Sequence, residues 1–165
     1  MNTIRTEEEV KYTATALLRF DNDLQVIEYA VNLIKEHVKV RGFSATSNEI
    51  VQAWLKQEFM HEEREVFAAL FLDSKYRLIA FDRMFYGTID SVQIPSREVV
   101  KAALKHNAAA VIFVHNHPSG VPDPSRADKA ITKKLIDALD LVDIKTLDHF
   151  IIGDTVYSFA AKGLL

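Results

Sequence analysis

The chain has 165 residues, of which 48% are hydrophobic, and this is the size of one globular domain with a sizeable core. It has no cysteine, which excludes disulfides, thiolate zinc fingers and cysteine nucleophiles, so any metal has to be held by His, Asp or Glu. The formal net charge of −3 provides no bulk attraction for nucleic acid.

Residues 1–42 are predicted to form an N-terminal segment with one helix. Residues 12–20 are compatible with an edge strand or with loose packing, and Asp23 is the expected N-cap of a helix over residues 24–41, which Gly42 ends. The segment lacks the apolar core of a signal peptide, and no stretch of the chain approaches the ~20 apolar residues of a membrane span. We therefore expect a cytoplasmic protein that does not contact membranes.

A second helix is predicted after Thr46, which forms a possible capping box with Glu49. Its apolar residues share one face at helical spacing: Ile50, Val51, Trp54, Leu55 and Phe59.

The composition changes at residue 61, where a charged run leads into an apolar stretch over residues 66–72. This stretch is apolar on both alternating faces, which is typical of a strand that is covered on both sides. A turn over 73–75 and a strand over 77–86 predict a hairpin, and a short strand is expected at 91–94. The next helix opens at Pro95 and ends near His106, with these residues on its buried side: Val99, Val100, Ala103 and Leu104.

The last part of the chain supplies one strand, one helix and one hairpin. Apolar residues from Ala108 predict a strand that persists through His117, and a helix follows over 126–141. Strands over 144–152 and 155–160 are joined by a tight turn at Gly153-Asp154. This order predicts an α/β fold, a mixed β-sheet flanked by helices, with the main domain at residues 43–165.

The strand that ends in two histidines predicts a metal site. His115 and His117 are one residue apart, so in a strand both imidazoles project from the same face. Asp128 adds a carboxylate from the first turn of the next helix. A His, His, carboxylate set with an open fourth position is the usual composition of a catalytic zinc site.

Ser125 and Asp128 also have the spacing of a helix N-cap box, which would hold the carboxylate rigidly. The Ser125 hydroxyl is in addition a candidate donor to an oxyanion. Hydrolysis also needs a proton acceptor, and the candidates are Glu62, Glu63 and Glu65, of which Glu65 directly precedes the apolar strand. A solvated acidic run explains these glutamates equally well.

A glutamate at the head of an apolar strand, then HxH, seven residues, S, two residues and D, resembles the JAMM (MPN+) metalloprotease motif. The surrounding segments resemble the bacterial RadC family and cover most of the chain from residue 44 onward. They are REVFAALFLDSKYRLI, FYGTID, PSREVVKAALKHNAAAVIFVHNHPSG, PDPSRADKAITKKL and LVDIKTLDHFIIG.

The resemblance implies a JAB/MPN fold, with layering like that of cytidine deaminases, and a zinc-dependent hydrolase of peptide or isopeptide bonds. It implies that His115, His117 and Asp128 bind Zn²⁺, that Ser125 assists the tetrahedral intermediate, and that Glu65 deprotonates the metal-bound water. The implied substrate is a peptide or an isopeptide-linked protein, including conjugates of ubiquitin-like modifiers. Longer RadC members carry an N-terminal helix-hairpin-helix region, whereas this chain has room for one or two helices there and resembles a short form.

Two alternatives follow from the same resemblance. One is an accessory protein of DNA repair or recombination, which rests on the RadC name alone, and the other is an MPN scaffold without turnover, which the intact motif disfavours. Asp148-His149 is either a pair that orients a metal ligand or a packed, hydrogen-bonded histidine, and the second interpretation is favoured. Neither the substrate nor the oligomeric state follows from the sequence.

Overall fold

The computed structural model describes residues 22–27, 29–30, 47–87 and 94–165, and the chain divides into two units, Met1–Glu36 and His37–Leu165. In the first unit, residues 23–27 and 29–30 are helical. The side-chain oxygen of Asn22 accepts a hydrogen bond from the Gln25 amide at 3.0 Å. The N-cap is therefore Asn22 and not Asp23, which lies one residue inside the helix.

Several predictions fall outside the described residues. They are the strand over 12–20, most of the helix over 24–41, the boundary between residues 42 and 43, and residues 91–93 of the short strand. Ile94, the last residue of that predicted strand, is not in a strand.

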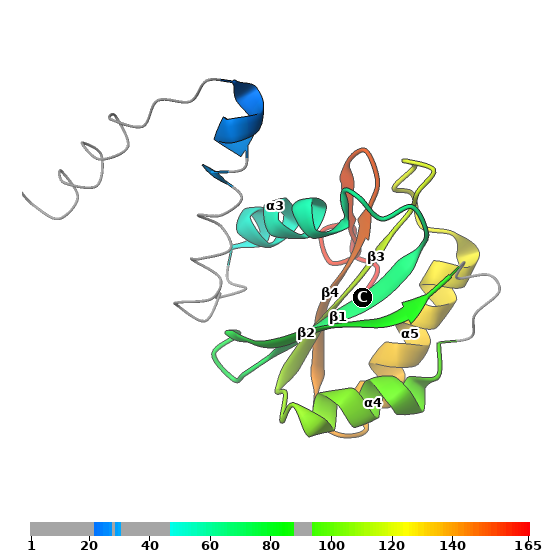
Figure 1. The fold of residues 1–165 in the computed structure, drawn as a ribbon. Coiled ribbons are helices and arrows are strands. Elements are labelled where there is room, and N and C mark those ends of the chain that lie inside the picture. Colours follow the sequence, from blue (N-terminus) through cyan, green and yellow to red (C-terminus); the bar gives the residue numbers. More distant parts are fainter. Residues whose placement is uncertain (1–21, 28, 31–46, 88–93) are drawn as a thin grey trace, which may run out of the picture. The chain divides into compact units, whose positions relative to one another are not determined.

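The second unit contains a five-stranded sheet with the order β2-β1-β3-β4-β5 (Figure 1). The strands are β1 (Val66–Leu72), β2 (Leu78–Tyr86), β3 (Ala110–Asn116), β4 (Lys145–Ile152) and β5 (Val156–Ser158). Only the β3–β4 pair is parallel among the pairs in the described ranges, so the sheet is mixed. The helices are α3 (Asn48–Phe59), α4 (Ser96–Lys105) and α5 (Arg126–Asp140). The predicted α/β class, a mixed sheet flanked by helices, is confirmed.

The helices cover both faces of the sheet, as Figure 1 shows. Helices α4 and α5 pack on one face, where Val99 and Leu135 meet Phe113 of β3 in one buried cluster. Helix α3 packs on the other face, where the ring of Trp54 lies 5.0 Å from that of Phe81 in an edge-on contact. Strands β1 and β3 are buried along their whole length because they lie at the centre of the sheet between these layers.

Two helices begin or pack differently from the prediction. The N-cap of α3 is Ser47, whose hydroxyl accepts from the Ile50 amide at 3.5 Å, and not Thr46. Ile50 itself is exposed, because it lies about 100° round the helix from Val51, the first buried residue. In α4, Val99 and Ala103 are buried, whereas Val100 is half-buried and Leu104 is exposed.

Strand β3 ends at Asn116, one residue earlier than predicted, because the chain turns at His117. The amide of Gly120 donates to the carbonyl of His117 at 2.9 Å and closes this turn. The amide of His117 still donates to the carbonyl of Ile152 at 2.8 Å, so the residue stays in line with the sheet. Helix α5 ends at Asp140 and β5 spans three residues, both shorter than predicted.

The turn between β4 and β5 is packed directly against the loop that follows β3. The amide of Asp154 donates to the Gly120 carbonyl at 2.8 Å. A Cβ atom on Gly153 would lie 2.4 Å from that same carbonyl oxygen, so this position requires glycine. Within the described ranges, no helix has the length and apolar character needed to cross a bilayer.

Leu135 anchors α5 in the core and supplies a test of the packing. We expect Leu135→Ala to lower the free energy of unfolding by about 2 to 5 kcal/mol, because the side chain is fully buried and its loss leaves a cavity. Urea unfolding followed by circular dichroism measures this change. Lys134→Ala on the exposed side of α5 is the matched control and should change the value by less than about 0.5 kcal/mol.

Candidate metal centre

The structure brings together the three predicted metal ligands, His115, His117 and Asp128. The two Nε2 atoms of the histidines lie 3.0 Å apart. The Asp128 carboxylate oxygens lie 3.4 Å from Nε2 of His115 and 3.6 Å from Nε2 of His117. Ligands about 2.0 to 2.1 Å from a tetrahedral zinc ion lie about 3.3 to 3.4 Å from one another, so these atoms have the spacing of a metal-binding group.

The backbone that carries each histidine fixes its ring. His115 belongs to β3 and is completely buried, with its ring stacked on Phe67 of the neighbouring strand. Nδ1 of His117 lies 2.7 Å from the carbonyl oxygen of Val121. A carbonyl only accepts, so Nδ1 of His117 carries the proton, and Nε2 of the neutral ring presents a lone pair to the cluster.

Asp128 is held by the cap of α5, as predicted. The Ser125 hydroxyl accepts from the Asp128 amide at 3.1 Å, and the Ser125 amide donates to Oδ2 of Asp128 at 2.7 Å. Both halves of the capping box are therefore present. The carboxylate is buried and lies in the first helical turn, where the helix dipole also favours a negative charge.

The charges in the cluster act on one another. Burial lowers the pKa of His115, whereas the adjacent Asp128 carboxylate raises the pKa of His117. Burial alone would raise the pKa of Asp128, but the neighbouring rings of His115 and His117 outweigh it and hold this pKa far below its usual range. Asp128 is therefore an anion at neutral pH, as a metal ligand has to be.

Among the three predicted proton acceptors, Glu65 is the one whose charge reaches the histidines. Phe67 pairs with His115 in the antiparallel β1–β3 ladder, so Glu65, just before β1, and His117, just after β3, lie at the same edge of the sheet. The charge of Glu65 adds to the raised pKa of His117 and partly opposes the lowering of the His115 pKa by burial. Glu62 instead lies 3.4 Å from the Arg83 guanidinium, and Glu63 is exposed.

Asn116, between the two histidines, had no role in the sequence analysis. Its side-chain oxygen accepts from the Val66 amide at 2.8 Å, and its side-chain nitrogen donates to the Arg64 carbonyl at 3.0 Å. The residue is buried, so its amide joins the chain on both sides of Glu65 to the end of β3. The position of Asn116 next to an apolar run was the available signal for a structural role. Its partners lie about 50 positions away in the sequence, and the local pattern does not indicate them.

His149 lies next to His115 and is completely buried, and burial lowers its pKa well below the ordinary value. Its Nε2 lies 2.8 Å from Nδ1 of His115, and its Nδ1 lies 2.6 Å from the Thr132 hydroxyl. His149 is a packed, hydrogen-bonded histidine, which is the interpretation that the sequence favoured. It also contacts the candidate ligand His115. The Asp148 carboxylate accepts from the His149 amide and the Ser158 hydroxyl, and the side-chain partners of the His149 ring are His115 and Thr132.

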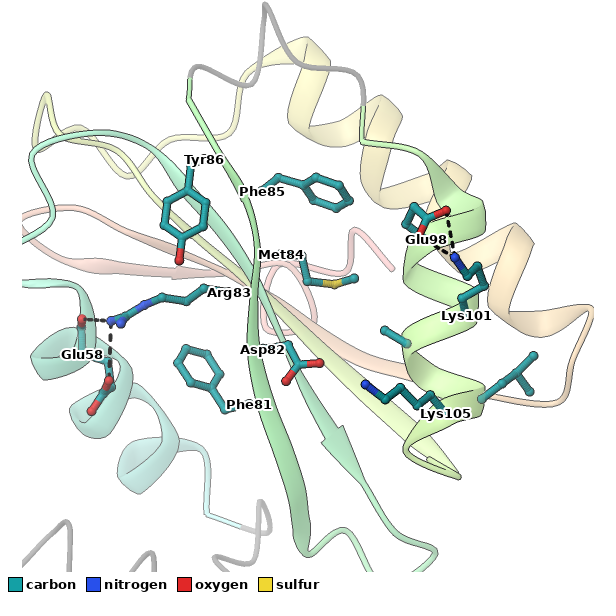
Figure 2. Close-up of a pocket in the computed structure, with 12 residues that line it drawn as sticks. Glu58, Phe81, Asp82, Arg83, Met84, Phe85, Tyr86, Glu98, Lys101 and Lys105 are labelled. Atoms are coloured by element: carbon teal, nitrogen blue, oxygen red, sulfur yellow. Dashed lines mark hydrogen bonds and ion pairs between the residues drawn. The ribbon is translucent and has the colours of Figure 1, made fainter.

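The described residues of the second unit line a small hollow and a larger groove. The hollow, of about 280 Å³, borders the cluster and is lined by residues that include Asn116, His117 and Asp154. The groove, of about 1140 Å³, runs along β2 between α3 and α4, with Arg83 and Phe81 on the α3 side and Met84 on the α4 side, as Figure 2 shows. None of the three clustered side chains lines this larger groove, so the smaller hollow is the one beside the chemistry.

A mixed sheet with helices on both faces and a His, His, Asp group at the end of a central strand, with His115 and Asp128 buried and His117 partly buried, defines an α/β domain with a candidate metal centre. The model of the RadC-like JAB domain matches residues 45–164, and the chain belongs to this family. The chain is 54% identical to a UPF0758 protein of Thioalkalivibrio sulfidiphilus over 125 residues, which are 76% of this chain and 56% of that relative.

Further relatives have the same name. A UPF0758 protein of Cellvibrio japonicus is 51% identical over 141 residues, which cover 85% of this chain and 62% of that protein. A UPF0758 protein of Vibrio cholerae is 48% identical over 141 residues, covering 86% of this chain and 89% of the relative. The chain thus spans less than two thirds of the first two relatives and most of the third.

The bonds of Asn116 predict a measurable loss on substitution. We expect Asn116→Leu to lower the free energy of unfolding by about 1 to 3 kcal/mol, because the Val66 amide would stay buried without its acceptor. Thermal and urea unfolding measure this loss. Gln52→Leu in α3, which removes an exposed side-chain hydrogen bond to Asn48, is the matched control and should change stability by less than about 0.5 kcal/mol.

Proposed function

We propose that the protein is a zinc-dependent hydrolase of the JAMM type that cleaves peptide or isopeptide bonds. The observation that carries the proposal is the convergence of two imidazole nitrogens and one buried carboxylate at the spacing of tetrahedral metal ligands. Membership of the RadC-like JAB domain family supports it. The intact ligand set disfavours an MPN scaffold without turnover.

The donor set fits zinc. His115 and His117 would each supply Nε2 and Asp128 one carboxylate oxygen, and nitrogen with oxygen ligands suits this ion in the absence of cysteine. Three protein ligands leave a position for water or substrate. When bound, zinc supplies Lewis acidity, which lowers the pKa of a coordinated water and polarises a carbonyl oxygen.

The residues around the ligands supply the proton transfers. The Glu65 carboxylate would accept the proton of the attacking water and return it to the leaving amine. The Ser125 hydroxyl accepts in the capping bond, which leaves its own proton for the oxyanion that develops on the substrate carbonyl. The capping box would hold this hydroxyl in place while the charge develops.

Metal content tests the ligand assignment. We expect protein purified without added metal to contain about one zinc ion per chain, and Asp128→Ala and the double variant His115→Ala/His117→Ala to contain none. Inductively coupled plasma mass spectrometry measures the stoichiometry. His61→Ala, at an exposed histidine, is the control and should keep full zinc. Full zinc in the double variant would contradict the assignment.

Hydrolysis tests the role of Glu65. With fluorogenic peptides and isopeptide-linked conjugates as substrates, we expect Glu65→Gln to lower kcat about 100- to 10,000-fold, because the amide cannot accept the proton. The zinc content should stay unchanged in this variant. Glu63→Gln, two residues away and exposed, is the matched control. Equal activity of Glu65→Gln and the parent protein would exclude Glu65 as the base.

The Ser125 hydroxyl can be tested apart from the helix cap. Glycine costs only a few tenths of a kcal/mol at an N-cap and keeps the backbone amide that binds Asp128, so Ser125→Gly should fold. We expect kcat to fall about 100- to 1000-fold with the loss of one oxyanion donor. Ser47→Gly makes the same change at the N-cap of α3 and should leave kcat unchanged.

A further inference from the structure

We propose that Thr132 and His149 are positioning residues that hold a proton on Nδ1 of His115, which directs the lone pair of its Nε2 toward His117 and Asp128. This deepens the proposed function and rests on it, because the lone pair is the one that would bind zinc. Thr132, His149 and His115 come from α5, β4 and β3, and consecutive hydrogen bonds join them.

The order of protons begins at Thr132. Its hydroxyl lies 2.5 Å from the Asp128 carbonyl oxygen, one helical turn earlier, and because a carbonyl only accepts, the hydroxyl proton points there. A hydroxyl has a single proton. Toward Nδ1 of His149, at 2.6 Å, the Thr132 oxygen can therefore only accept.

His149 must accordingly carry a proton on Nδ1. The ring is completely buried and contacts the aromatic rings of Phe67, Phe113 and Phe159 at centroid distances of 5.7, 5.9 and 4.9 Å. A second proton would make it a cation among apolar rings, which is costly. Nε2 of His149 is therefore an acceptor.

The final step fixes His115. Its Nδ1 lies 2.8 Å from Nε2 of His149, and because that nitrogen accepts, Nδ1 of His115 donates. In the neutral ring, Nε2 is then without a proton and faces the other two ligands. The Val121 carbonyl likewise keeps a proton on Nδ1 of His117, whose Nε2 lies 3.0 Å from that of His115, so a cation bound between them would meet both Nε2 atoms.

Thr132→Val tests this order with little change in shape. Without an acceptor for Nδ1, His149 should place its proton on Nε2 and donate to His115, which moves the His115 proton to Nε2, where it competes with the metal. We expect zinc to bind about 10- to 100-fold more weakly, the usual effect of losing a hydrogen-bond partner behind a ligand. Thr132→Ser keeps the hydroxyl and is the matched control, with affinity close to that of the parent protein.

Two readouts decide the result. Two-bond proton–nitrogen NMR of metal-free protein at mildly alkaline pH reports which ring nitrogen carries the proton, and competition with a chromophoric chelator gives the zinc affinity. We expect Nδ1–H at His115 and His149 in the parent and in Thr132→Ser, and Nε2–H at both in Thr132→Val. Nε2–H at His149 in the parent, or unchanged tautomers and affinity in Thr132→Val, would overturn the proposal.

The same data separate this inference from the proposed function. If the parent protein shows the expected tautomers but binds no zinc, the hydrolase proposal fails, whereas the proton order stands. If the parent binds zinc, and Thr132→Val binds it equally well with unchanged tautomers of His115 and His149, the proton order fails and the hydrolase proposal stands. His149→Gln gives an independent check, because its amide can accept from His115 and donate to Thr132. It should bind zinc more tightly than His149→Phe, which can do neither.

Discussion

The antiparallel pairing of β1 with β3 is the constraint on which the candidate site depends. The pairing of Phe67 with His115 sets the register, and this register brings Glu65, which directly precedes β1, to the edge of the sheet where His117 directly follows β3. A slip of one residue would turn every side chain to the opposite face of the sheet and separate these groups. Such a slip is costly because both strands are packed on both faces. The hydrogen bond from the Val66 amide to the Asn116 side chain also fixes the register at the end of the ladder.

The parallel pairing of β3 with β4 accounts for the third ligand. Two parallel strands need a crossover connection, and α5 lies in the connection between β3 and β4. The helix therefore begins close to the end of β3 and runs back toward the start of β4. The capping box then orients Asp128 with the same two bonds that start the helix. The same crossover brings Thr132 to His149 on β4, so one helix serves the carboxylate and the histidine pair together. The stability of the fold and the geometry of the cluster therefore share their interactions.

The sequence predicted the elements whose signals are local. Strand β1 was predicted at its observed bounds because apolar residues fill it without interruption, and the cap of α5 was predicted from the spacing of Ser125 and Asp128. The caps at Asn22 and Ser47 were missed by one residue because neighbouring polar residues are nearly equivalent as N-caps. Asn116, Thr132 and His149 act through partners 17 to 54 residues away, and such contacts leave no periodic pattern in the sequence.

The backbone contact between Gly153 and Gly120 has a consequence for remote substitutions. The turn after β4 and the loop after β3 meet backbone to backbone, so a larger residue at Gly153 would push the two segments apart. His117 stands at the start of that loop, so the β4–β5 hairpin contacts the candidate ligands in two ways, through this loop and through the ring of His149. Random mutagenesis that selects for altered metal retention should therefore accumulate changes in this hairpin as well as around the ligands. Insertions in either loop should be tolerated only when the other loop changes with it.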